Sequence, residues 1–434
     1  MVPHPPRRPG SDEQAVTPPA GAGHGPGRRA VLRGGLVAAA GVAATAAVSS
    51  CQVGSNGSST VATTRPAAAG SEPTDAATVA FRGARQAGVV TDPQPFAAFV
   101  GLDLPKGADR DTCRRLMGVW TDDIERLMAA RGPLTDLEAE LAQVPSRLTV
   151  TVGVGPGFYA AADLRAHAPS WLAPLPRFSI DRLDQAWRQT DVVLQVRADS
   201  PVAVAHATRR LVVGADPLAN QVWVQRGFRE PLTATDAGLP FRNQFGQIDG
   251  TVQPATNGPD DPLLWIGAGD PKPPKGLAGG TSMVIRRIAM NMDTWDRADR
   301  VARENAIGRR LDNGAPLTGT KPTDHPNLQA KDALGFPVID DASHLRRAMP
   351  AQPHERILRA PYAYDDPPVG SARTNTGLVF VAFQADPVRQ FVPIQTRLAE
   401  ADLMNIWTTP IGSSVYAVLP GAGAGETLGQ ALLS

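Results

Sequence analysis

The order of its apolar segments constrains the fold of this chain more than any other feature. Short runs of strand length alternate with longer runs of helical spacing. The first half predicts the order strand, helix, strand, strand, helix, strand, at residues 96–102, 109–130, 148–153, 192–196, 201–211 and 222–225. That order is typical of an α+β unit of ferredoxin-like type.

A similar order returns in the second half of the chain. Strands are predicted at 283–288, 378–383 and 416–419, and helices at 293–304 and 387–400. A length of 434 residues suits two domains with accessory segments. We therefore expect domains at 77–235 and 236–434, with two helix-covered sheets and a cleft between or beside them. The pattern leaves the order of strands in each sheet open.

The start of the chain has a different character. Residues 1–27 are rich in Pro and Gly, and Arg28 and Arg29 precede an Ala-rich apolar run at 34–48. A basic region before a short apolar run is typical of a secretory signal, and the paired arginines resemble a twin-arginine signal. The alternative is a Sec signal that carries an arginine pair by chance. We expect export from the cytoplasm.

The apolar run ends in Val48-Ser49-Ser50-Cys51, which resembles a lipobox. We predict a signal over 1–51, with Cys51 as a lipid-bearing N-terminus, and a flexible tether over 52–76. The mature protein would then be secreted or anchored as a lipoprotein. An ordinary cleavage site and a disulfide to Cys113 are the alternatives for Cys51.

Composition excludes several other classes of protein. The net charge is +1, which gives no basic surface for a nucleic-acid partner. The two cysteines form no C-x-x-C motif, which argues against zinc fingers, iron–sulfur clusters and covalently attached haem.

The most informative motif is a G-x-x-D-G-T-x-x-P segment at 246–254. It resembles the signature of dye-decolorising haem peroxidases. Five other segments resemble that family's elements in the family's order, at 83–89, 279–288, 308–319, 343–348 and 356–366. The resemblance covers roughly residues 77–425 and is closest to the exported branch that includes the deferrochelatases. It implies two ferredoxin-like domains in a dimeric α/β-barrel-like arrangement, with non-covalent haem b in the C-terminal domain.

The resemblance also implies roles for individual residues. His344 would be the haem-iron ligand, since histidine is the usual axial ligand of peroxidases. Asp249 would move the peroxide proton and Arg359 would stabilise charge as the O–O bond breaks. Gly250 and Arg286 are the further cofactor-binding candidates, Arg286 through a haem propionate. An anionic partner for His344 is expected, but the sequence does not identify it.

Rivals and departures accompany these assignments. His325 and His206 compete with His344, while Arg356, Arg346 and Arg347 compete with Arg359. Ala360 and Pro361 stand where the family branch often has a second Arg and a Gly. Pro361 offers no side-chain donor to the distal pocket.

The implied function is reduction of hydrogen peroxide through a ferryl porphyrin radical, with oxidation of dyes or other one-electron donors. Deferrochelatase-like release of haem iron, or a part in iron uptake, is the first alternative. A non-catalytic haem carrier is the second. Bulky aromatic donors, a homo-oligomer and iron-uptake proteins are the partners to consider.

Overall fold

The computed structural model describes residues 78–230, 241–270 and 272–434. The predicted signal, the tether and the boundary at 235–236 lie outside these residues. The first half contains the expected ferredoxin-like unit, with four antiparallel strands in the order β2-β3-β1-β4. Its main elements are β1 (Phe96–Asp103), α1 (Arg110–Met128), β2 (Thr149–Val154), β3 (Val192–Ala198), α3 (Pro201–Ala215) and β4 (Asn220–Phe228). Shorter helices are η2 (Ala139–Ala142), α2 (Pro156–Ala161), η3 (Arg165–His167) and η4 (Gln185–Trp187).

Local signals fix where the two main helices of this unit begin. The Asp109 side chain accepts a hydrogen bond from the Thr112 backbone N–H, and the Ser200 side chain does the same for Ala203. Both residues are therefore N-caps, which satisfy backbone donors at the start of α1 and α3. The buried face of α1 carries Trp120 and packs beneath the sheet.

The second half is also ferredoxin-like, with the order β9-β5-β8-β7. Its strands are β5 (Thr281–Met290), β6 (Leu358–Arg359), β7 (Tyr362–Asp366), β8 (Asn375–Gln384) and β9 (Thr408–Val418). Its helices are η6 (Gly258–Asp260), α4 (Asp261–Leu264), α5 (Met292–Trp295), α6 (Arg300–Ile307), α7 (His344–Ala348), α8 (Phe391–Ala401), η7 (Leu403–Ile406) and α9 (Gln430–Leu433).

One predicted helix of this half is wrong. Residues 293–304 form no single helix, because Asp299 adopts an extended conformation between α5 and α6. Its side chain accepts a hydrogen bond from the Ala302 backbone N–H at 2.8 Å and so begins a new helix. Aspartate inside an apparent helical pattern is thus a start signal here.

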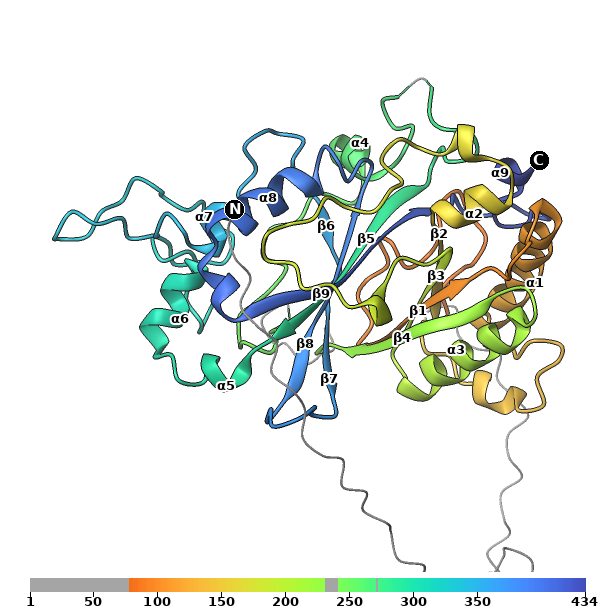
Figure 1. The fold of residues 1–434 in the computed structure, drawn as a ribbon, viewed down its shortest axis with the longest axis horizontal. Helices are drawn as coiled ribbons and strands as arrows, with labels where there is room; N and C mark the ends of the chain where they lie inside the picture. Colours follow the sequence, from red (N-terminus) through yellow and green to blue (C-terminus); the bar gives the residue numbers. More distant parts are fainter. Residues whose placement is uncertain (1–77, 231–240, 271) are drawn as a thin grey trace, which may run out of the picture. The chain divides into compact units, whose positions relative to one another are not determined.

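The two sheets close into one barrel through their edge strands (Figure 1). β2 pairs with β9 at Gly153↔Val418, and β4 pairs with β7 at Phe228↔Ala363. Together with the pairing of β5 with β8, these contacts make a closed antiparallel ring. The fold class is confirmed, but the two sheets expected from the sequence are joined edge to edge.

Strands β6 and β7 are one strand interrupted by Pro361. Both pair with β8 in the same register, since Arg359 faces Ala382 and Tyr362 faces Val379. Proline has no backbone N–H to give to the ladder, so the pairing lapses there. The departure from the family pattern noted in the sequence therefore has a structural consequence next to Arg359.

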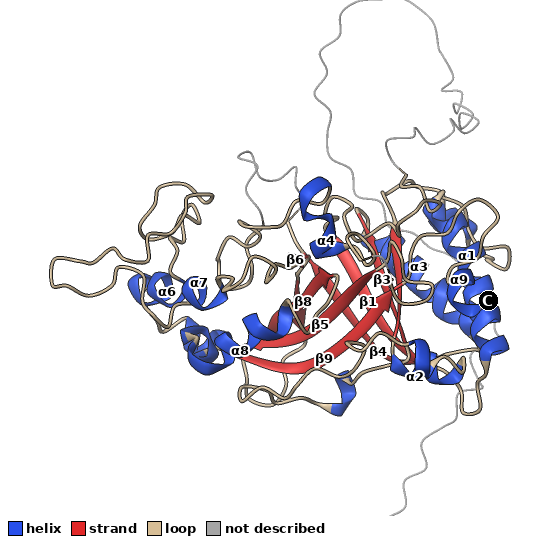
Figure 2. Cartoon of the chain, turned by 90° about the horizontal axis from the view of Figure 1, so that it is seen from above, coloured by secondary structure: helices blue, strands red, loops and turns tan. Residues whose placement is uncertain are grey.

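Side chains alternate between the two faces of the barrel wall. One apolar cluster fills the inner face of the barrel wall, and from this strand it includes Leu358, Ala360, Tyr362 and Tyr364. Arg359 alternates with these residues, so its side chain belongs to the outer face. Figure 2 shows the strands between two groups of helices, with α6, α7 and α8 on one side and α1, α3 and α9 on the other. Across the described ranges, no helix is long and apolar enough to cross a bilayer.

Candidate active site

His344 is the first residue of α7 and lies against the end of α8. Its Nδ1 is 2.6 Å from Oδ2 of Asp402, which is 4% exposed. The other carboxylate oxygen of Asp402 accepts from the Met404 backbone N–H at 2.9 Å. The carboxylate is thus held at both oxygens. Nε2 of His344 has no hydrogen-bond partner among the described residues and is the ring atom available to a metal.

The electrostatics of His344 reflect this partner. Burial lowers the pKa of the imidazole, but the charge and hydrogen bond of Asp402 outweigh it, so the pKa lies above its ordinary value. The side chain is 44% exposed, yet burial is the largest single influence on its pKa. A carboxylate at Nδ1 raises the basicity of Nε2 toward a metal.

Asp249 sits in a tight turn. Its backbone N–H donates to the Phe241 carbonyl at 2.9 Å, and its Oδ1 accepts from the Gly250 N–H at 2.7 Å. Gly250 has a φ of +81°, in the left-handed region that favours glycine. The glycine therefore allows the turn that presents the carboxylate.

Arg359 is held by its backbone. Oε1 of Gln253 accepts from the Arg359 N–H at 3.0 Å, and Nε2 of Gln253 donates to the Arg359 carbonyl at 2.8 Å. Nη1 of Arg359 also donates to the Val252 carbonyl at 3.1 Å. The motif that supplies Asp249 thus also fixes the strand that carries Arg359.

The three predicted site residues come together. Nη2 of Arg359 is 3.8 Å from Oδ1 of Asp249. The charge of Asp249 raises the pKa of His344 and the charge of Arg359 lowers it, so both groups lie within electrostatic reach of the imidazole. Side chains from segments about 100 residues apart therefore share one site.

The segment 308–316 joins the two sides of this site. A Cβ on Gly308 would lie 3.1 Å from Leu345 Cβ, and one on Gly314 would lie 3.1 Å from Ile248 Cβ. Both glycines have positive φ values, +83° and +72°. Their close approach packs this segment against the neighbours of both His344 and Asp249.

Arg309 lies in that same segment and brings a half-buried positive charge. Burial lowers its pKa, and the charge of Arg359 lowers it further, which places the two guanidinium groups near each other. Nη1 of Arg309 donates to the carbonyls of Gly314 and Pro322 at 2.7 and 3.0 Å. No carboxylate of the described chain pairs with Arg309. Two neighbouring cations suit an anionic ligand.

Arg286 has a different partner from the one expected. Its guanidinium pairs with Asp181 through Nη2 and donates to Ser413 Oγ at 3.1 Å. Arg286 and Asp181 are each 1% exposed. A haem propionate could reach Arg286 only by displacing this carboxylate, so the propionate role stays a prediction.

Two of the three rival arginines are engaged elsewhere, whereas the buried Nε of Arg347 has no hydrogen-bond partner among the described residues. Arg356 forms two 2.9 Å bonds to Asp260, and Arg346 pairs with Asp341 at 2.7 Å. His325 is exposed. His206 lies on α3 and is buried beside Asp136. In the part of the chain that the structure describes, Arg359 is the arginine that pairs with Asp249.

Sequence reasoning missed Asp402 and Gln253. Asp402 follows α8 and caps η7, a position that capping explains without function. No sequence signal links it to a residue 58 positions earlier. Gln253 lies inside the 246–254 motif, so the motif marked its importance but not its partner.

Comparison with known proteins agrees with the fold and the motifs. Models described as Dyp-type peroxidase, N-terminal and C-terminal, match residues 86–229 and 241–423. A dye-decolorizing peroxidase of Thermobifida fusca is 36% identical, over 79% of this chain and 83% of its own. A deferrochelatase of Yersinia pestis is 30% identical, over 97% and 96%.

Solved structures are similar as well. The crystal structure of a DyP-type peroxidase from Cellulomonas bogoriensis has a TM-score of 0.79 and 52% identity. It matches 82% of this chain and 98% of its own length. With both halves matched, in order, by the family's own models, the chain belongs to the Dyp-type peroxidase family.

Proposed function

We propose that this protein reduces hydrogen peroxide at a haem held by His344, with Asp249 and Arg359 acting on the peroxide. The protein is a haem peroxidase by family. The observation that carries the residue assignment is the shared site of His344, Asp402, Asp249 and Arg359.

The residues fit haem. Nε2 of His344 is free of hydrogen bonds within the described ranges. Asp402 holds Nδ1, as a carboxylate commonly does for the ring nitrogen of a metal-bound histidine that does not bind the metal. Arg309 offers a half-buried guanidinium to a propionate. When bound, haem supplies two electrons to peroxide and later recovers them, one at a time, from donors.

The protein residues handle protons and charge. The Asp249 carboxylate would take a proton from one oxygen of hydrogen peroxide and return it to the other oxygen, which would leave as water. The Arg359 guanidinium stabilises negative charge on the leaving oxygen, since it stays protonated and offers several donors. Gln253 and Gly250 hold these two groups in place.

The experiment that tests this assignment begins with the absorption spectrum of the purified protein, followed by stopped-flow mixing with peroxide. Asp249→Asn and Arg359→Leu should keep haem and slow the reaction with peroxide by about 10²–10³-fold. Rates within about twofold of wild type for both variants would reject the assignment, since this is far below the expected loss.

Deferrochelatase activity is a second candidate, favoured by the Yersinia relative that matches nearly the whole chain. Release of iron from haem consumes two protons and leaves protoporphyrin, which fluoresces. Anaerobic incubation of the haem-loaded protein separates the two functions. Growth of porphyrin fluorescence without peroxide would support chelatase activity, and its absence would leave peroxidase activity alone.

Export and anchoring rest on the sequence. We propose that Arg28 and Arg29 direct the folded protein into the twin-arginine pathway, which accepts cargo that has already bound haem. Acylation at Cys51 would then fix the protein to the outer face of the membrane.

A further inference from the structure

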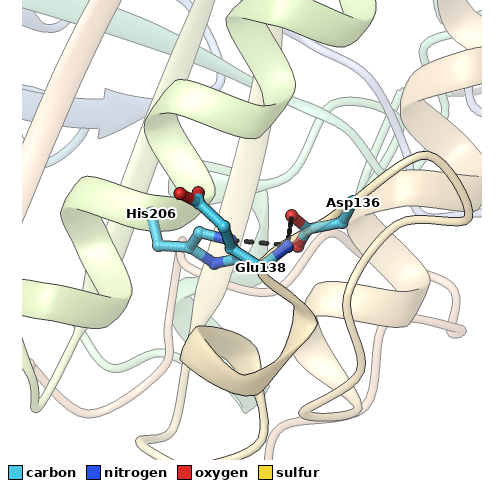
Figure 3. A group of neighbouring side chains, drawn as sticks. All are labelled: Asp136, Glu138 and His206. Atoms are coloured by element: carbon cyan, nitrogen blue, oxygen red, sulfur yellow. Dashed lines mark hydrogen bonds and ion pairs between the residues drawn. The ribbon is translucent and has the colours of Figure 1, made fainter.

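A buried histidine and a buried carboxylate face each other far from the haem ligand, in the N-terminal half. Nε2 of His206, on α3, is 3.0 Å from Oδ2 of Asp136, in the loop before η2 (Figure 3). The two side chains are 2% and 0% exposed. Despite this distance, neither atom has a hydrogen-bond partner within the described chain. Buried polar atoms without partners are rare in proteins and require an explanation.

A third ligand group is close by. One carboxylate oxygen of Glu138 lies within 4.8 Å of a ring nitrogen of His206 and of a carboxylate oxygen of Asp136. Asp136 is turned toward His206 because its other oxygen accepts the Glu138 backbone N–H at 3.0 Å. Two ligands of one zinc ion, each bound at 2.0–2.2 Å, are about 3.3–3.6 Å apart in tetrahedral geometry. The pair at 3.0 Å is a little closer than this, so a small separation of the two side chains would admit the ion.

The surrounding charges allow a cation. Arg209 pairs with Glu138, but both side chains are 49% exposed, so this pair is weak and easily exchanged. Nε of Arg210 is 3.6 Å from the oxygen of Asp136 that faces away from His206. Burial raises the pKa of Asp123, and the charge of Asp136 adds to the rise, so a further carboxylate lies near.

The loop that carries Asp136 needs an anchor. Leu134, Leu137 and Val144 are 84%, 96% and 70% exposed, so the segment gains little from apolar burial. Its attachments to the helices are polar, such as the 2.7 Å bond from Arg126 Nε to the Gly132 carbonyl. A metal bridging the loop and α3 would supply what the core does not.

We propose that Asp136, Glu138 and His206 form a structural site for a divalent zinc ion, with water as the fourth ligand. Imidazole nitrogen and carboxylate oxygens are ligands that zinc accepts in four-coordinate sites. The ion joins the loop before η2 to α3 and replaces the unpaired contact between His206 and Asp136. Glu138 exchanges Arg209 for the metal by rotation of its half-exposed side chain.

The test uses the full-length, tag-free, haem-loaded protein after dialysis against EDTA. Calorimetric titration with zinc chloride should give one equivalent bound, and zinc should raise the melting midpoint. Glu138→Gln should weaken zinc binding at least about tenfold. Glu140→Gln removes an exposed glutamate of η2 that is outside the cluster, and should bind zinc as wild type does.

A purely structural His–Asp pair makes the opposite prediction. Asp136→Asn would then lower the melting midpoint equally with EDTA and with zinc, and wild type would bind no zinc at this site. Absence of binding by wild type, or binding that Glu138→Gln and Asp136→Asn leave unchanged, would overturn the proposal. Because the side chain of Glu138 is half exposed, its variant stays informative if Asp136→Asn fails to fold.

Discussion

Nδ1 of His344 lies 2.6 Å from Oδ2 of Asp402, and this contact decides which ring nitrogen can bind iron. The buried carboxylate accepts a hydrogen bond from Nδ1–H. The lone pair of the neutral imidazole is then on Nε2. The other oxygen of Asp402 is occupied by the Met404 N–H, so the carboxylate cannot turn away without a loss.

Asp402→Asn should weaken haem binding and raise the reduction potential of the bound iron. If the amide oxygen keeps the bond to the Met404 N–H, its NH₂ group faces Nδ1 and favours the tautomer with the proton on Nε2. Loss of such a partner typically costs 10–100-fold in metal affinity or activity. Haem titration and spectroelectrochemistry measure both effects.

Asp386→Asn is the matched control, since Asp386 also accepts backbone N–H bonds but lies before α8, at the opposite end of the helix from Asp402. It should leave haem affinity and potential unchanged. Equal behaviour of Asp402→Asn and wild type would show that the carboxylate does not tune the iron.

Gln253→Leu should slow the reaction with peroxide while leaving haem content intact. The substitution removes both bonds that hold the Arg359 backbone, and a displacement of about 1 Å at a catalytic group can cost about 10²-fold. Gln253→Glu keeps the acceptor for the Arg359 N–H and should be intermediate. Stopped-flow rates in the order wild type, Glu, Leu are expected, and identical rates for all three would refute the positioning role.

Arg286→Ala should destabilise the protein by about 3–5 kcal/mol, because it leaves the buried Asp181 carboxylate unpaired. Haem content per folded molecule should not change. Denaturant unfolding and the haem-to-protein absorbance ratio give the two readouts. If Arg286→Ala loses haem and Asp181→Asn retains it, then Arg286 does bind a propionate.

Replacing Arg28 and Arg29 together with Lys should keep the protein in the cytoplasm, because the paired arginines are the address of the pathway. Cell fractionation with immunoblotting measures the distribution. Unchanged export would favour the Sec alternative. Mass spectrometry of the exported wild type decides the fate of Cys51, where a mass increase expected for acylation supports the lipobox.

The strands buried on both faces were the part of the fold most open to prediction. β3 and β8 are rich in apolar residues, and their limits came out within a few residues. β7 was missed because two of its five residues are aspartates and Pro361 separates it from β6. Closure of the ring depends on single pairings such as Phe228↔Ala363, which leave no trace in local periodicity.

The site divides in the same way. Asp249, His344 and Arg359, to which we assign the chemistry, stand in recognisable segments, so their sequence context made them candidates. Asp402 and Gln253 act through contacts across 58 and 106 residues, and neither residue type is unusual where it stands. The pairing of Arg286 with Asp181 could not be foreseen, because Asp181 comes from the other half of the chain.

Ring closure also governs how copies of this molecule meet. An open sheet offers rows of unpaired N–H and C=O groups that can template strand addition by a neighbouring chain. Here the two edge strands of the first half, β2 and β4, are paired with the two edge strands of the second half, β9 and β7. Before the interruption at Pro361, strand β6 ends in the charged Arg359. The barrel wall therefore leaves few unpaired strand edges to which a neighbouring chain could add a strand in an amyloid-like stack.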